Sequence, residues 1–269
     1  MKELAGRTAL LTGASGGLGG YLARTLSGEG VRLLLSGRDE AKLAAAAASL
    51  APTAPEPTVM PADLAEPWAA TELAARATAA GPVDILVNNA GIELVEPFER
   101  SREDDLERII AVNLRAPISL TRALAPGMLE RGEGHVVNVA SLAGRLPPAY
   151  SAAYAATKAG LIAFTHSLRG EFAGRPVGFS AICPGFVDGD GMYARLLESG
   201  LPAPAAVGTV PPRKVTSALL DALRHDKPEI LICGRPMRPL VAAGFAVPRL
   251  AERMLAASGI HDYFRRAAA

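Results

Sequence analysis

Short apolar runs alternate with longer stretches of helical pattern along most of the chain. The apolar runs lie at 8–13, 31–37, 58–64, 83–91, 134–141, 177–185 and 228–234. Between them, apolar residues recur at helical spacing, and these helical stretches lie at 17–30, 38–51, 68–81, 104–132 and 151–173. The pattern predicts strands and helices in regular alternation, with Pro117 and Pro126 kinking or breaking the helix at 104–132.

Strand–helix–strand repetition predicts parallel strands joined by right-handed crossovers, with helices on both faces of the sheet. The segments TALL, LLL, DILV, VVNV and ILIC are continuously apolar, which is typical of strands that are buried on both faces. The predicted fold class is therefore α/β, a doubly wound, seven-stranded parallel sheet. No internal repeat and no convincing linker interrupt the pattern, so residues 1–269 are expected to form a single domain.

Composition excludes several classes of protein. The chain has 49% hydrophobic residues and a formal net charge of +1, so it can build a large core but lacks the basic surface of a nucleic-acid binder. Cys183 and Cys233 are expected to be free thiols in a reducing, cytoplasmic location. The N-terminus has no signal-peptide pattern, and no window is long and apolar enough to predict a membrane-spanning helix. The four histidines lack metal-ligand spacing, so no metal is expected; they are His135, His166, His225 and His261.

A glycine-rich turn follows the first predicted strand. The stretch TGASGGLGG (12–20) places Gly13, Gly17 and Gly19 between that strand and a helix. Glycine lets backbone N–H groups approach an anion, and a helix N-terminus adds partial positive charge. A turn that merely ends the strand is the alternative. The position favours a loop that binds the phosphates of a dinucleotide.

The end of the second predicted strand bears on the choice of cofactor. NAD-binding proteins of this fold usually have an acidic residue there, which binds the ribose hydroxyls. Here the strand ends in Ser-Gly-Arg, and the planar fork of Arg38 suits a 2′-phosphate. NADP(H) is therefore favoured over NAD(H). Alternatively, Arg38 is a solvated residue at the start of the next helix.

One tyrosine and one lysine stand four residues apart in the alanine-rich stretch SAAYAATKAG (151–160). This spacing places Tyr154 and Lys158 on one face of a helix. A free phenol has a pKa of ~10, and a nearby ammonium group lowers that value toward neutral pH. Taken alone, the pair could equally be two polar residues on a helix surface. Together with a dinucleotide loop, it predicts a proton-transfer pair.

Several motifs together resemble the short-chain dehydrogenase/reductase family of about 250 residues. They occur in the family's order from residue 7 to about residue 188: TGASGGLG (12–19), Asp63 in ADL, NNAG (88–91), Asn113 in VNL, Ser141 in VNVAS, YAATK (154–158) and PG (184–185). The resemblance implies a Rossmann-type fold. It also implies an NADP(H)-dependent oxidoreductase that transfers a hydride between the nicotinamide and a carbonyl or secondary alcohol substrate.

The resemblance implies a role for each matching residue. Tyr154 is the general acid/base, Ser141 hydrogen-bonds the substrate oxygen, and Lys158 also reaches the nicotinamide ribose. Asn113 holds a water that links Lys158 to solvent, while Asn88 ties strands together. Structural roles remain alternatives for Asn113, as a buried amide, and for Ser141. The implied cofactor-binding residues are Gly13, Ser15, Gly17, Leu18, Gly19, Arg38, Asp63, Leu64, Asn89, Gly91, Tyr154, Lys158, Pro184, Gly185 and Val187.

The chain departs from the family's pattern after PG, where Gly189 stands in place of the usual threonine. The Gly- and Pro-rich segment 189–212 is expected to form an irregular substrate lid. Its apolar residues are either a cover over the substrate or ordinary helix packing; they are Met192, Tyr193, Leu196 and Leu197. The extension 235–269 is expected to contact another subunit or cover the cleft, and contact with a membrane surface is less favoured.

Three functional hypotheses follow. The first is NADPH-dependent reduction of an apolar carbonyl substrate by a homodimer or homotetramer. The second is NAD-linked oxidation of a secondary alcohol by the same residues. The third is a catalytically silent dinucleotide sensor, which is disfavoured because all four candidate catalytic residues are present.

Overall fold

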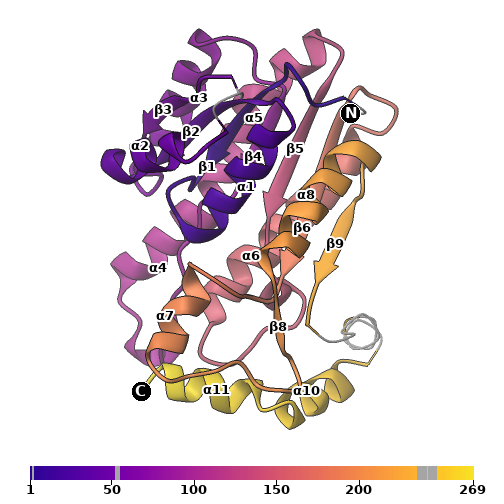
Figure 1. Cartoon of the computed structure of the whole chain (residues 1–269). Coiled ribbons are helices and arrows are strands. Elements are labelled where there is room, and N and C mark those ends of the chain that lie inside the picture. The colour runs from indigo at the N-terminus through magenta and orange to yellow at the C-terminus, as the bar shows by residue number, and fades with distance from the viewer. Residues whose placement is uncertain (2, 52–54, 235–240, 242–246) are drawn as a thin grey trace.

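The sheet has the predicted seven parallel strands. The computed structural model describes residues 1, 3–51, 55–234, 241 and 247–269. The strands are β1 (Thr8–Thr12), β2 (Arg32–Gly37), β3 (Thr58–Pro61), β4 (Ile85–Asn88), β5 (Gly134–Val139), β6 (Val177–Pro184) and β9 (Glu229–Ile232). Their order is β3-β2-β1-β4-β5-β6-β9, which reverses direction at β1 and β4 (Figure 1). The predicted fold class is confirmed.

Helices cover both faces of the sheet. One face carries α1 (Gly17–Gly28), α2 (Glu40–Ala48) and α8 (Pro212–His225), and the other carries α3 (Ala69–Ala79), α5 (Ala116–Glu130) and α6 (Ala152–Glu171). Strand β1 shows why its run is continuously apolar. Ala9 and Leu11 pack into the core under α1 and α8, while Leu10 packs into the core under α3 and α5. Alternate side chains thus face opposite cores, and both positions are buried.

The long helical stretch at 104–132 is one continuous run of helix. It consists of α4 (Glu103–Ile110), a π-helical turn (Ala111–Arg115) and α5. Neither Pro117 nor Pro126 breaks the run, because α5 contains both prolines and continues to Glu130. The prediction that the prolines would break the helix was therefore wrong. The irregular turn contains Asn113 and lies directly before α5.

Beyond the carboxyl ends of the strands lies a separate layer that the apolar pattern did not predict. It contains the short parallel strands β7 (Phe186–Val187) and β8 (Thr209–Val210), with α7 (Met192–Glu198) between them. Alongside lie α10 (Pro248–Ala257) and α11 (Ile260–Ala267), at the bottom of Figure 1. The segment 189–212 is thus more regular than expected. Residues 235–240 and 242–246 of the predicted extension lie outside the described residues.

Two short 3₁₀ helices complete the secondary structure, η1 (Phe98–Arg100) and η3 (Leu142–Gly144). In the described part of the chain, no helix combines the length and the apolar character needed to span a bilayer. The layer formed by α7, α10 and α11 shares an apolar cluster with η3, which follows β5. This cluster forms one side of a cavity that lies beyond the carboxyl ends of the strands.

Candidate active site

A cavity of about 600 Å³ lies beyond the carboxyl ends of the strands. It begins at the glycine loop after β1, passes the ends of β4, β5 and β6, and ends under α7, α10 and α11. In doubly wound sheets, ligands bind beyond the carboxyl ends of the strands. Every residue predicted for cofactor binding or catalysis lines the cavity, with the exception of Asn113.

The glycine loop has room for backbone only. Gly13 has φ +65°, and a Cβ there would lie 2.8 Å from the Cα of Ala90. A Cβ at Gly19 would lie 2.0 Å from the carbonyl oxygen of Gly13. Helix α1 begins here, and no side chain of the described protein caps its N-terminus. Its first N–H groups therefore face the cavity and suit the pyrophosphate of a dinucleotide.

The segment that follows β7 crosses directly over this loop. A Cβ at Gly17 would lie 2.0 Å from the carbonyl oxygen of Asp190. Gly189 and Gly191 on either side have φ +87° and +133°, values that side-chain-bearing residues rarely adopt. Glycines at 17, 189 and 191 thus allow two backbones to touch at the phosphate end of the cavity.

Charged side chains surround the adenosine end of the cavity. Arg38 and Asp63 both line it, as predicted, and so does Arg108 from α4. The carboxylate of Asp63 accepts hydrogen bonds from the N–H of Ala65 at 3.1 Å and from Arg108 at 2.9 Å. Burial raises the pKa of Asp63, but these two hydrogen bonds outweigh it, and the net pKa lies below its usual value. Asp63 is therefore an ionised acceptor held by a second arginine.

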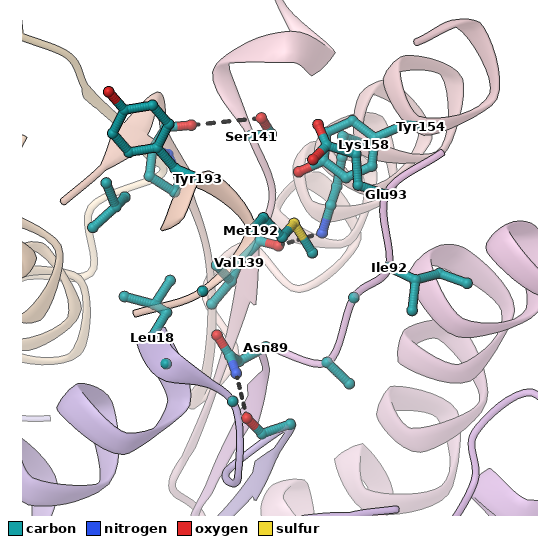
Figure 2. A pocket seen from close by; sticks show the side chains of 18 of the residues that line it. Leu18, Asn89, Ile92, Glu93, Val139, Ser141, Tyr154, Lys158, Met192 and Tyr193 are labelled. Carbon is teal, nitrogen blue, oxygen red and sulfur yellow. Dashed lines mark hydrogen bonds between the residues drawn. The ribbon is translucent and has the colours of Figure 1, made fainter. Parts of the chain in front are cut away.

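Asn88 and Asn89 of the NNAG motif have different hydrogen-bond partners. The amide of Asn88 donates to the Oδ1 of Asn138 at 2.8 Å and joins β4 to β5, as predicted. The amide of Asn89 donates to the carbonyl oxygens of Thr12 and Gly13, at 3.0 and 3.1 Å (Figure 2). Both donors of Asn89 are thus engaged by the protein, and this side chain shapes the glycine loop.

Asn113 is fully buried in the π-helical turn. Its Oδ1 accepts from the N–H of Ile92 at 2.9 Å, and its Nδ2 donates to the carbonyl of Ile92 at 2.8 Å and to Thr157 at 3.2 Å. These three bonds satisfy most of the amide and fix the chain just after β4. The geometry agrees with the buried-amide alternative, and the water-holding role stays a prediction.

Ser141, Tyr154 and Lys158 meet at the middle of the cavity (Figure 2). Ser141 follows β5, and its hydroxyl donates to the carbonyl oxygen of Pro184 at 3.5 Å and accepts from the N–H of Ala143 at 3.1 Å. The Nζ of Lys158 lies 5.7 Å from the centre of the Tyr154 ring and donates to the carbonyl of Val139 at 2.9 Å. The i, i+4 spacing on α6 therefore brings both side chains to the same cleft, as the sequence predicts.

Burial sets the protonation states of Tyr154 and Lys158. It raises the pKa of Tyr154, and the charge of Glu93 raises it further, while the hydrogen bond from Ser141 acts in the opposite direction. Burial also lowers the pKa of Lys158 to about 8. The pKa of Tyr154 is therefore raised and not lowered as expected, because loss of hydration disfavours the phenolate. At neutral pH Tyr154 is a phenol, able to donate a proton.

The far side of the cavity is apolar. Its wall comes from η3 and the residues after it, from α7, from the segment before β8 and from the C-terminal helices, and consists of Leu142, Leu146, Met192, Leu196, Val207, Leu255, Ile260 and Phe264. Tyr193 also lines the cavity, whereas Leu197 is 51% exposed and points away from it. The described part of the extension thus covers the cleft, which was one of the two favoured expectations.

Six charged residues that line the cavity were not predicted: Asp39, Lys42, Glu93, Arg108, Asp190 and Arg195. Glu93 lies in the loop after β4, and Arg195 lies on α7. A single charged residue in a loop or on a short helix carries no spacing signal. Only the fold shows that these side chains share one cleft.

Comparison with known proteins places these features in a family. The family model for short chain dehydrogenases matches residues 7–198. Ketoacyl reductase HetN of Nostoc is 34% identical over 274 residues, covering 100% of this chain and 94% of its own. A Rickettsia felis 3-oxoacyl-[acyl-carrier-protein] reductase is 36% identical over 190 residues, covering 71% of this chain and 76% of its own.

Solved structures agree. A metagenomic short-chain oxidoreductase in complex with NADP has a TM-score of 0.72 and 33% identity, covering 85% of this chain and 97% of its own. A 3-oxoacyl reductase of Agrobacterium tumefaciens with NADP bound has a TM-score of 0.78 and 30% identity, covering 86% and 94%. The chain belongs to the short-chain dehydrogenase/reductase family and is an NAD(P)-dependent oxidoreductase of that family.

Proposed function

We propose that this protein uses NADPH to reduce the carbonyl group of an apolar substrate, with Tyr154 as the proton donor. The observation that carries the proposal is the content of one cavity. A neutral tyrosine, a buried lysine and a serine hydroxyl lie between a glycine loop that suits phosphates and an apolar wall that suits a hydrocarbon chain or ring system.

The residues present fit a dinucleotide with a 2′-phosphate. The glycine loop and the N-terminus of α1 would hold the pyrophosphate, Arg38 the 2′-phosphate, and Asp63 the adenine. Lys158 would hold the nicotinamide ribose, and the backbone at 184–187 the nicotinamide itself. The two solved relatives described above contain NADP, which supports the choice of NADP(H) over NAD(H). When bound, the nicotinamide supplies the hydride to the carbonyl carbon.

The chain's own residues manage the oxygen of the substrate. Ser141 donates a hydrogen bond that orients the carbonyl oxygen beside Tyr154. As negative charge develops on that oxygen, Tyr154 donates its proton and becomes a phenolate. Lys158, on the same helix face, stabilises the phenolate through its charge. The raised pKa of Tyr154 makes the phenol the resting form, which is the form that can donate the proton.

The apolar wall supports a hydrophobic ketone. Several relatives are named ketoacyl reductases, which supports a ketone attached to a hydrocarbon chain. The substrate would lay this chain against η3, α7 and the C-terminal helices. A homodimer or homotetramer remains the predicted assembly.

A substrate panel tests the proposal. Purified protein is given long-chain and cyclic ketones with NADPH or NADH, and secondary alcohols with NADP⁺ or NAD⁺, while absorbance at the nicotinamide band is followed. We expect ketone-dependent oxidation of NADPH. Preferred oxidation of alcohols with NAD⁺ would favour the second hypothesis, and no turnover across the panel would favour a dinucleotide sensor.

The role of Tyr154 has its own test. Tyr154→Phe should lower kcat by at least about a thousandfold, because it removes the phenol proton that the proposed step transfers to the substrate oxygen. NADPH binding, followed by its fluorescence, should persist. Tyr21→Phe on α1 is the matched control and should keep its activity. A Tyr154→Phe variant with most of the wild-type activity contradicts the proton-donor role.

A further inference from the structure

Glu93 is an acidic side chain beside the catalytic group that the proposed mechanism does not use. It lines the cavity, and Figure 2 shows it next to Tyr154 and Lys158. Its charge reaches both of those side chains, raising the pKa of each. Glu93 therefore lies within electrostatic range of the atoms that handle the substrate oxygen.

Among the residues that the structure describes, Glu93 has no hydrogen-bond or ion-pair partner within bonding distance. Burial raises the pKa of its carboxyl group, and the charges of Arg195 and Lys158 act in the opposite direction without forming a contact. Because the carboxylate lines the cavity, a hydrogen-bond donor to it has to come from water or from a ligand in the cavity.

A second polar atom near Glu93 also lacks a partner. The hydroxyl of Tyr263, on α11, is buried and makes no hydrogen bond within the described chain. Burial is the main cause that raises its pKa, and the charge of Glu93 contributes, so the two groups lie within electrostatic range of each other. The Tyr263 hydroxyl does not line the cavity, so Glu93 is the member of this pair that a ligand can reach.

The surrounding charges select the kind of group that Glu93 can bind. A cationic group of the substrate would be repelled by Lys158 and Arg195, whose positive charges already act on this carboxylate. An anionic group, or a second carbonyl that can only accept, would face the carboxylate without a donor between them. A neutral hydroxyl group both donates to the carboxylate and avoids the two cations.

We infer that Glu93 is a specificity-determining residue, which accepts a hydrogen bond from a hydroxyl group that the substrate carries close to its reacting carbonyl. The inference rests on the proposed carbonyl reduction at the same site. It makes hydroxylated apolar ketones better substrates than unsubstituted ketones, and it disfavours substrates with a carboxylate at that place.

Matched substrates test the inference. The parent is a ten-carbon methyl ketone; three derivatives carry a hydroxyl on the first, second or third carbon from the carbonyl, and a fourth carries a carboxylate. With wild-type protein and NADPH, at least one hydroxylated ketone should exceed the parent in kcat/KM by about tenfold or more, which is typical of a hydrogen bond to a charged group. The carboxylate derivative should be the poorest substrate.

Two variants separate the effects of charge and hydrogen bonding. Glu93→Leu should bring the ratio of kcat/KM between the best hydroxylated ketone and the parent close to one. Glu93→Gln keeps an acceptor and should give an intermediate ratio, together with a gain for the carboxylate derivative. Glu99→Gln, an exposed residue on η1, is the matched control and should retain the wild-type ratio.

Calorimetric binding provides a readout that does not depend on turnover. The ketones are titrated into protein saturated with NADP⁺, which cannot reduce them. The hydroxyl should tighten binding about tenfold in wild-type protein and have no effect in Glu93→Leu. Equal binding of parent and hydroxylated ketones by wild-type protein, or a preference that persists in Glu93→Leu, overturns the inference. Hydroxyl-dependent binding without reduction supports Glu93 as a binding residue and contradicts only the proposed reaction.

Discussion

The buried lysine of the cleft makes the stability of this protein depend on pH in a predictable direction. Lys158 is 3% exposed, and burial lowers its pKa from 10.5 in the unfolded chain to about 8 in the folded protein. Between these two values the unfolded chain binds a proton at this site and the folded protein does not. Raising the pH through this window therefore stabilises the folded state, and the stabilisation is absent below pH 8.

The size of the effect follows from the width of the window. Each pH unit within this window changes the free energy of unfolding by about 1 kcal/mol. Between pH 7 and pH 9.5 the contribution of Lys158 should thus rise by roughly 2 kcal/mol. Lys158→Met keeps most of the side-chain volume and removes the titrating group, so the variant should lack this contribution.

The assay compares urea unfolding of wild-type and Lys158→Met protein, followed by circular dichroism at equal protein concentration. The free energy of unfolding of wild type minus that of the variant should increase by roughly 2 kcal/mol between pH 7 and pH 9.5. Other titrating groups cancel in this difference. Lys42→Met, at a side chain that is 72% exposed, should give a difference that does not change with pH. A flat difference for Lys158→Met would refute the claim that burial keeps this amine largely uncharged above pH 8.

Three further changes have defined outcomes. Gly19→Ala places a Cβ 2.0 Å from a backbone oxygen and should raise the Kd for NADPH more than about tenfold. Gly28→Ala, whose Cβ meets nothing within 4 Å, should leave this Kd unchanged. Equal effects of the two substitutions would contradict the assignment of the glycine loop as the pyrophosphate site. Asn113→Ala removes the bonds to the Ile92 backbone and should lower the free energy of unfolding by about 1–3 kcal/mol in urea, and an unchanged midpoint would show that these bonds are dispensable. Arg38→Ala should raise the KM for NADPH far more than that for NADH, and a similar rise for both would make Arg38 a bystander.

The sheet and its phosphate loop are predictable because they depend on local patterns. Runs such as the one at 8–13 are apolar at every position, and the sheet buries them on both faces for that reason. Gly13 and Gly19 recur between a strand and a helix, where only backbone fits. The four-residue spacing of Tyr154 and Lys158 survives folding because both belong to one helix.

The features that sequence patterns do not predict depend on contacts between distant segments. The π-helical turn contains Asn113, which bonds to Ile92, 21 residues away, and apolar spacing carries no signal for such a turn. Arg108 reaches Asp63 from 45 residues away. The electrostatics of Tyr154 also escaped prediction, because spacing gives the neighbouring cation but not the depth of burial or the charge of Glu93.

The carbonyl of Asp190 lies against Gly17, so one short segment borders both the cofactor region and the substrate region of the cavity. The segment 189–191 forms part of the substrate region and also rests on the loop that suits the pyrophosphate. Because the two backbones lie against each other, a shift of either the glycine loop or the segment 189–191 changes the phosphate end and the substrate end of the cavity together.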